Sequence, residues 1–79
     1  MTLPNHPRIA MDPNVCHGKP VIAGTRVMVW QILGALAGGD TAETLLKDYP
    51  TLKPGDIEAA LAFGAELAQS KEVPELVAK

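Results

Sequence analysis

Residues 29–39 read Val-Trp-Gln-Ile-Leu-Gly-Ala-Leu-Ala-Gly-Gly, and their spacing decides the fold class. Apolar residues three and four positions apart form one face of a helix, with Gln31 on the opposite side. The members of this face are Val29, Ile32, Leu33 and Leu36, and Trp30 and Ala37 widen it. Gly38 and Gly39 follow, and glycine ends helices because it accepts a left-handed backbone without a Cβ clash. The stretch therefore predicts a first helix that ends at this glycine pair.

A second helix is predicted directly after the glycine pair. Asp40 and Thr41 are alternative N-caps, and Asp40 has Glu43 three residues later, which is a capping-box pattern. The apolar residues that follow at helical spacing are Ala42, Leu45, Leu46 and Tyr49. Pro50 then ends the helix, because proline has no backbone N–H to continue it.

The third predicted helix is the longest and begins at Pro54, a residue tolerated in the first helical turn. Asp56 complements the helix dipole there. The face expected to be buried consists of Ile57, Ala60, Leu61, Gly64 and Ala68. The pattern fades near Ser70, so residues 71–79 are predicted to be a tail or a short docking turn.

Residues 1–26 are dense in proline and glycine, which excludes a long helix and favours short strands joined by turns. We expect strands at residues 8–11 and 21–23. Because an isolated pair of strands is marginal in water, this β arm must pack on the helices or add to a second copy of the chain. The predicted fold class is mainly α: a single domain of 79 residues with a β arm (1–26), a three-helix unit (27–70) and a tail (71–79).

Composition limits the classes of function. The 79 residues carry a net charge of −2 and are 47% hydrophobic, which suits one soluble domain and excludes a two-domain enzyme. Chains this short bury only about 60% of their unfolded surface, so self-association is expected. The charge balance lacks the basic excess of a dedicated nucleic-acid binder.

Cys16 is the only cysteine, which excludes an internal disulfide and fits a reducing cytoplasm. His6 and His17 add too few ligands for a closed zinc site, and no cofactor is expected. Cys16 and His17 are adjacent, and neighbours in an extended strand point to opposite faces, so a nucleophile and base pair is not expected. We predict no catalytic residues, no metal and no membrane-spanning segment.

The second and third helices, joined by residues 50–53, form an arrangement in which the last helix could lie in a DNA major groove. A plain three-helix bundle explains the same pattern. The charge distribution restricts DNA binding, because residues 1–39 carry three cations and one acid whereas residues 40–79 carry four lysines and eight acids. The candidate DNA contacts are Arg8, Lys19, Arg26, Thr51 and Lys53.

Two further residues have alternative interpretations. Arg26, after Gly24-Thr25, either braces a turn by pairing with a carboxylate such as Asp12 or contacts phosphate or a partner directly. Trp30 is a core residue, a dimer contact or an anchor for another protein. Arg26, Trp30, Leu76 and Val77 are therefore the candidate partner contacts.

A longer pattern of residues resembles domain-of-unknown-function family 433. It consists of Ile9, Asp12-Pro13, Val15-Cys16, Gly18-Lys19-Pro20, Ile22, Gly24-Thr25-Arg26, Gly39, Tyr49-Pro50, Leu52, Asp56-Ile57 and Ala60-Leu61. The resemblance covers residues 8 to about 67. Two positions depart from it: Lys53 stands where the family commonly has a capping Ser or Thr, and Ala23 where a basic residue is common.

The resemblance implies a β arm before a homeodomain-like helix-turn-helix unit, and a place among VapB-like antitoxins encoded beside toxins with a PIN-like ribonuclease fold. In that case Gly18, Lys19, Pro20, Gly24, Thr25 and Arg26 form the signature of the arm, and residues 51–61 hold the recognition element. The expected function is an antitoxin that acts as a dimer, silences its toxin and binds its own operator. A cation such as Arg26, Arg8 or Lys79 could replace the metal held by the toxin's carboxylates. The alternatives are a DNA-binding regulator without a toxin and a small homodimeric scaffold.

Overall fold

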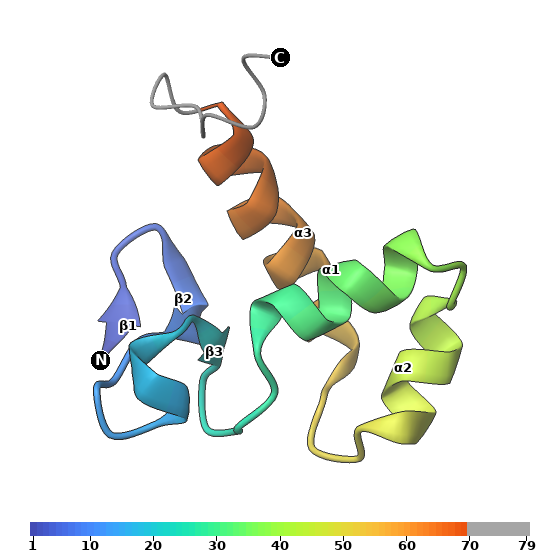
Figure 1. Ribbon diagram of the computed structural model, residues 1–79, viewed down its shortest axis with the longest axis horizontal. Coiled ribbons are helices and arrows are strands. Elements are labelled where there is room, and N and C mark those ends of the chain that lie inside the picture. Colours follow the sequence, from blue (N-terminus) through green and yellow to red (C-terminus); the bar gives the residue numbers. More distant parts are fainter. Residues whose placement is uncertain (70–79) are drawn as a thin grey trace.

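The computed structural model describes residues 1–69 and consists of a small sheet on one side and three helices on the other (Figure 1). In chain order the elements are β1 (Thr2–Leu3), β2 (His6–Ala10), the 3₁₀ turn η1 (Cys16–Gly18), β3 (Val21–Ile22), α1 (Val29–Ala37), α2 (Ala42–Asp48) and α3 (Pro54–Ala68). The predicted tail, with Leu76, Val77 and Lys79, lies outside the described residues. The mainly α fold with an N-terminal β arm is confirmed.

The sheet is antiparallel with strand order β1-β2-β3. Ile9 faces Ile22 across the central pair, and Ala10 faces Val21. The two predicted strands are thus present with shifted bounds, whereas β1 was not foreseen, because a two-residue strand leaves no periodic signal. The arm packs on the three-helix unit through β2 and α3, as an isolated strand pair requires.

Cys16 and His17 lie in a turn, whereas the sequence argument about this pair had used the geometry of an extended strand. Both residues have positive φ values, 51° and 58°, and lie in the η1 turn. The Cys16 side chain is half-buried and its Sγ lies 3.6 Å from the Arg26 carbonyl oxygen, whereas His17 is exposed. The contact given for the Cys16 thiol is thus with the backbone at Arg26.

The core joins the sheet to all three helices. Its completely buried large side chains are Ile9, Ile22, Ile32 and Leu45, and Val27, Val29, Leu52, Ile57, Ala60 and Phe63 surround them. Each helix contributes at least one of these residues, and so do β2 and β3. The core therefore fixes the arm and the helices as one packed body.

Five residues of the predicted apolar faces are exposed, so their prediction as buried is wrong. Trp30 is 58% exposed and Leu61 is 48% exposed, and Ala37, Ala42 and Ala68 also face solvent. The sheet contacts the side of α3 that carries Phe63. The rings of His6 and Phe63 pack edge to face there, with their centroids 5.3 Å apart. That contact turns Leu61 outward, which periodicity alone could not show.

The structure shows which residues cap the N-termini of α2 and α3. Thr41, not Asp40, caps α2, since the Thr44 amide donates to Thr41 Oγ1 at 3.1 Å. At α3 the Lys53 side chain makes no capping hydrogen bond, and instead the Lys53 amide donates to Asp56 Oδ2 at 2.8 Å. Asp56 thus supplies one half of a capping box and offsets the missing Ser or Thr.

Candidate functional site

A tight turn at residues 22–27, which we name the signature turn, positions Arg26. The Thr25 hydroxyl donates to the Ile22 carbonyl oxygen at 2.8 Å and accepts from the Val27 amide at 3.0 Å. The Ile22 amide donates to the Val27 carbonyl oxygen, and the Thr25 amide to the Ile22 carbonyl oxygen. These four bonds fix the backbone on both sides of Arg26, whose side chain is exposed.

Gly24 gives this turn its shape because its φ of +80° is rarely adopted by other residues. A Cβ at Gly24 would meet no atom within 4 Å, so the cost of Gly24→Ala is conformational, about 1 kcal/mol. Gly34→Ala, in the exposed interior of α1 with equally open space, is the matched control and should stabilise by about 0.5–1 kcal/mol. Urea unfolding of both variants measures these shifts. Equal changes in the same direction would contradict this role of Gly24.

Gly18, Lys19 and Pro20, the other half of the signature, connect the β arm to α1. The Lys19 amide donates to the Cys16 carbonyl oxygen at 3.2 Å, and the Val29 amide donates to the Pro20 carbonyl oxygen at 3.0 Å. Gly18, with φ +83°, completes the bend. Gly18, Lys19 and Pro20 therefore act through their backbone, and only the Lys19 side chain extends into solvent.

A surface hollow of about 790 Å³ lies beside the signature turn. We name it the Arg26 hollow. Its polar lining consists of Asp12, Thr25, Arg26, Gln31, Tyr49 and Thr51. The expected Arg26–Asp12 pair is absent, since Asp12 Oδ1 accepts from the Asn14 amide at 2.8 Å and Arg26 forms no ion pair within residues 1–69. The Arg26 guanidinium therefore remains available to an external anion.

A second hollow of about 590 Å³, the Arg8 hollow, lies on the other side of Gly24 and Thr25. Arg8, Thr51 and Lys53 line it together with Asp56. Arg8 Nη1 donates to Asp56 Oδ1 at 2.9 Å, and its guanidinium crosses so closely over Gly55 that a Cβ there would lie 2.5 Å from Nη1. The Arg8 charge is thus already paired, and its main role in this structure is to attach β2 to the start of α3.

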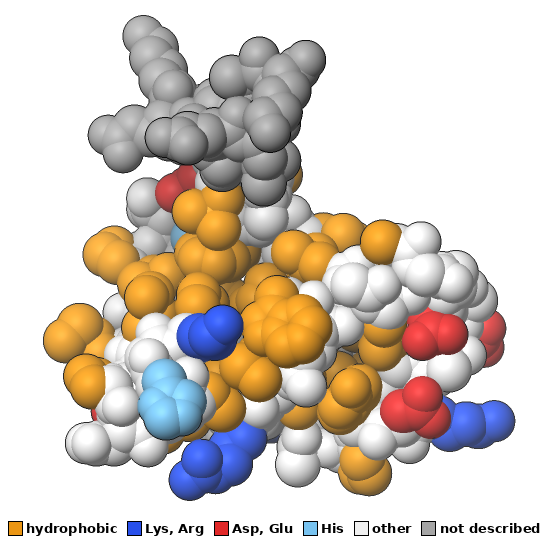
Figure 2. Space-filling view, viewed as in Figure 1, with side chains coloured by type: hydrophobic (Ala, Val, Ile, Leu, Met, Phe, Trp, Pro, Cys, Tyr) orange, Lys and Arg blue, Asp and Glu red, His pale blue; other side chains and the backbone are white. Residues whose placement is uncertain are grey.

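A third hollow, which we name the Trp30 groove, is smaller, about 350 Å³, and almost entirely apolar. Its lining includes Lys19, Val29, Trp30, Leu33, Phe63 and Leu67. Figure 2 shows the apolar side chains gathered in the middle of this face, over α1 and α3. Trp30 thus shares a surface with Lys19 and not with Arg26.

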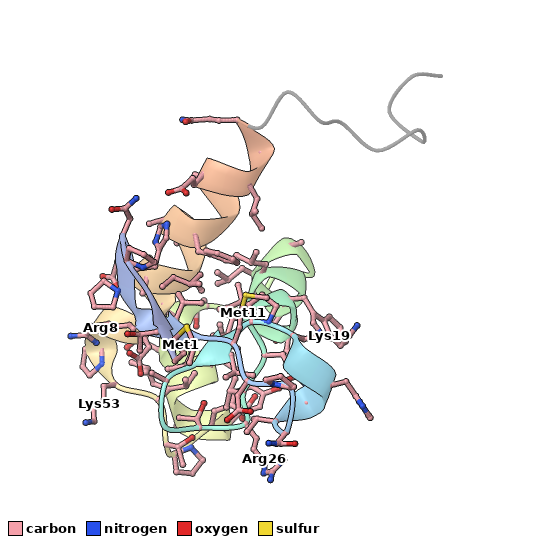
Figure 3. All side chains as sticks on the ribbon, turned by 90° about the vertical axis from the view of Figure 1, so that its left-hand side faces the viewer. Met1, Arg8, Met11, Lys19, Arg26 and Lys53 are labelled. Atoms are coloured by element: carbon pink, nitrogen blue, oxygen red, sulfur yellow. The ribbon has the colours of Figure 1, made fainter. Side chains whose placement is uncertain are left out.

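The five candidate DNA contacts do not form one surface. Figure 3 shows Arg8 and Lys53 at the left of the view, Lys19 at the right and Arg26 at the bottom. Arg8, Thr51 and Lys53 line the Arg8 hollow, and Thr51 also lines the Arg26 hollow together with Arg26. Within residues 1–69 no group of three His, Cys, Asp or Glu residues is placed to hold a metal ion.

Sequence reasoning missed two contacts that connect the arm to α3. One is the Arg8–Asp56 pair, and the other joins His6 Nε2 to Glu66 Oε1 at 2.7 Å. The partners are 48 and 60 residues apart in sequence. Asp56 alone had a local signal, as an acid in the first turn of a helix, but nothing pointed to Arg8.

Comparison with known proteins places these features in a family. The family model described as "Protein of unknown function (DUF433)" matches residues 9–64, which is more than half of the chain. The chain belongs to the DUF433 family. The matched part begins in β2 and ends in α3, so it contains the complete signature turn.

Two relatives support the assignment to DUF433. The uncharacterized protein y4eO of Sinorhizobium fredii (strain NBRC 101917 / NGR234) is 33% identical over 55 residues, which are 70% of this chain and 25% of that protein. The crystal structure of a DUF433 member from Anabaena variabilis ATCC 29413 aligns with a TM-score of 0.71 and 32% identity, over 75% of this chain and 58% of that one. The chain thus matches only a part of each relative. None of the helices among residues 1–69 is long and apolar enough to cross a membrane.

Proposed function

We propose that this DUF433 protein is an antitoxin that binds and silences a PIN-like ribonuclease toxin in the cytoplasm. The observation that carries the proposal is the exposed Arg26, which lines the Arg26 hollow, is held by the signature turn and forms no ion pair within residues 1–69. The resemblance to VapB-like antitoxins supplies the class of partner.

Arg26 has the chemistry that such a partner requires. A PIN-like active site holds a divalent metal through a cluster of carboxylates, and a guanidinium can pair with a carboxylate through two parallel hydrogen bonds. Because four hydrogen bonds fix the backbone of the signature turn, little backbone entropy is lost when Arg26 binds. Arg8, the other candidate cation among the described residues, is paired with Asp56.

The composition of α3 favours a protein partner over DNA. Its 15 residues contain three acids and no Arg, Lys, Asn, Gln, Ser or Thr. Reading base edges in the major groove depends mainly on such side chains. The exposed side of α3 also carries Glu58, which would face phosphates if the helix were docked in the groove.

Binding to the protein encoded next to this chain tests the proposal. We expect a stable complex and inhibited ribonuclease activity with the wild type. Arg26→Glu should weaken binding at least about 30-fold, because a charge pair of about 2 kcal/mol becomes a repulsion. Lys47→Glu is the matched control, since Lys47 is an exposed cation on α2 away from the Arg26 hollow, and it should bind like the wild type. An intact partner that forms no complex, or equal affinities for both variants, would overturn the proposal.

A second candidate function is operator binding by a homodimer through a helix-turn-helix formed by α2 and α3. The grouping of Arg8, Thr51 and Lys53 at the start of α3 favours it. Affinity for a pseudo-palindromic site should then fall steeply with salt, and Lys53→Ala should reduce the slope by about one charge. An affinity that does not change with salt would reject this candidate. If neither the ribonuclease nor the operator binds, the homodimeric scaffold remains as the alternative.

A further inference from the structure

The Arg26 hollow and the Arg8 hollow meet at the signature turn. Both include Gly24, Thr25 and Thr51 in their linings, so these three residues form a ridge between the two hollows. The ridge is low at Gly24, which is exposed and where an added Cβ would meet no atom within 4 Å. A glycine of this kind lets the backbone of a ligand approach closely. An extended chain can therefore cross the ridge from one hollow to the other.

Each hollow contains one cation that has no ion-pair partner within residues 1–69. These cations are Arg26 and Lys53, and the Lys53 side chain also makes no capping hydrogen bond. Both side chains are exposed, and Figure 3 shows them extending outward from the lower part of the molecule. Arg8 differs from them, since its guanidinium already donates to Asp56. The surface thus offers two positive charges, one on either side of the ridge.

The other polar groups of the two hollows restrict the ligand further. Of the two carboxylates in the linings, Asp56 is already paired, so Asp12 is the one that a ligand meets. Its Oδ1 accepts from the Asn14 amide, which leaves Oδ2 for another donor. Thr51, exposed on the ridge, adds a hydroxyl that can donate to an acid. A fitting ligand therefore carries acids for the two cations and an N–H donor for Asp12.

We propose that an extended acidic segment of the partner protein crosses this ridge and places one carboxylate on Arg26 and a second on Lys53. A peptide has a backbone N–H for Asp12 and carries charge only at chosen residues. A nucleic acid instead carries a negative charge at every phosphate, and Asp12 repels it. The identity of the partner rests on the proposed function, whereas the chemistry of its segment rests on the two hollows alone.

Charge reversal at the Lys53 side of the ridge tests this contact in the complex with the ribonuclease. Lys53→Glu should weaken binding about fivefold at low salt, and by less than about twofold in about 0.5 M salt, which screens exposed charges. Lys47→Glu, on α2 outside both hollows, is the matched control and should bind like the wild type. Circular dichroism should show the same helix content in all three proteins, since only the amide of Lys53 contributes to the cap of α3.

The proposed function and this inference fail in different ways in that experiment. If Arg26→Glu weakens the complex but Lys53→Glu binds like Lys47→Glu, the ribonuclease is the partner and its segment does not cross the ridge. That result would overturn the inference and leave the proposed function intact.

A synthetic peptide separates the chemistry of the segment from the identity of the partner. Hexaglutamate is titrated into the isotope-labelled full chain, with hexaglutamine as the uncharged control. We expect backbone amide shifts on both sides of the ridge, at residues 24–26 and 51–53, and none with hexaglutamine. If these shifts appear but the ribonuclease does not bind, the proposed function fails and the acidic segment stands. Shifts in only one of the two ranges, or in neither, would overturn the inference, as would tighter binding of a six-nucleotide thymidine oligomer, which would identify a nucleic acid as the occupant.

Discussion

Asp56→Ala is expected to lower the free energy of unfolding by about 2–3 kcal/mol, a large part of the stability of a chain this short. Asp56 is 5% exposed and accepts hydrogen bonds from Arg8 Nη1 and from the Lys53 amide. Loss of the helix cap costs about 1 kcal/mol. The charged hydrogen bond adds about 1–2 kcal/mol, at the low end because the Arg8 side chain is half exposed.

Urea unfolding monitored by circular dichroism measures this change. Glu58→Ala is the matched control, an exposed acid on the same helix that should alter stability by less than about 0.5 kcal/mol. In a double-mutant cycle, Arg8→Ala should cost much less when Asp56 is already alanine. If Asp56→Ala and Glu58→Ala have the same effect, Asp56 does not join the arm to the helices.

Ile32→Ala is expected to have the largest effect, a destabilisation of about 3–4 kcal/mol. Ile32 is completely buried and belongs to the core cluster shared by the sheet and the helices. A core this small has few other apolar contacts to compensate for the cavity. At about 0.05–0.15 kcal/mol per residue the whole chain is stable by only about 4–12 kcal/mol, so the variant is close to unfolding at 37 °C.

Thermal unfolding compares Ile32→Ala with Leu61→Ala. Leu61 is apolar and helical but 48% exposed, so its loss should cost less than about 1 kcal/mol. Ile32→Val should fall between the two, at about 1 kcal/mol. A smaller effect for Ile32→Ala than for Leu61→Ala would show that the helices pack differently from the described core.

The helices could be predicted because their signals are local. The spacing in residues 29–39 gave the bounds of α1 as observed, and Pro54 marks the start of α3. The interval from Thr41 to Tyr49 likewise contains α2. In each case the cap, the apolar spacing and the terminating residue lie within a few positions of one another, so no tertiary information was needed.

The sides that these helices bury could not be predicted as well. When the apolar stripe of a helix is broad, the sequence does not show which part of the stripe is buried. The position of the sheet determines that part. β2 packs near Phe63, so Leu61 faces solvent, and Trp30 lies beyond the edge of the core. Such placements arise between segments far apart in the chain.

The residues of the candidate site could be predicted from the sequence, but their individual roles could not. The resemblance to DUF433 gave the signature residues, but their roles differ in a way that only the structure shows. Gly24 and Thr25 build a turn, Gly18 and Pro20 connect the arm to α1, and Arg26 is presented to solvent. Arg8 carries the same charge as Arg26, yet a carboxylate 48 residues away has already paired with it.

We propose that the partner binds at the signature turn and the Arg26 hollow. Backbone amide shifts, measured by NMR while the labelled full chain is titrated with the ribonuclease proposed as its partner, give the sharpest test. We expect the largest changes at residues 24–27 and at Gln31, Tyr49 and Thr51, which share that hollow. Changes confined to the exposed side of α3, around Glu58 and Ala62, would contradict it, as would a spectrum that the ribonuclease leaves unchanged.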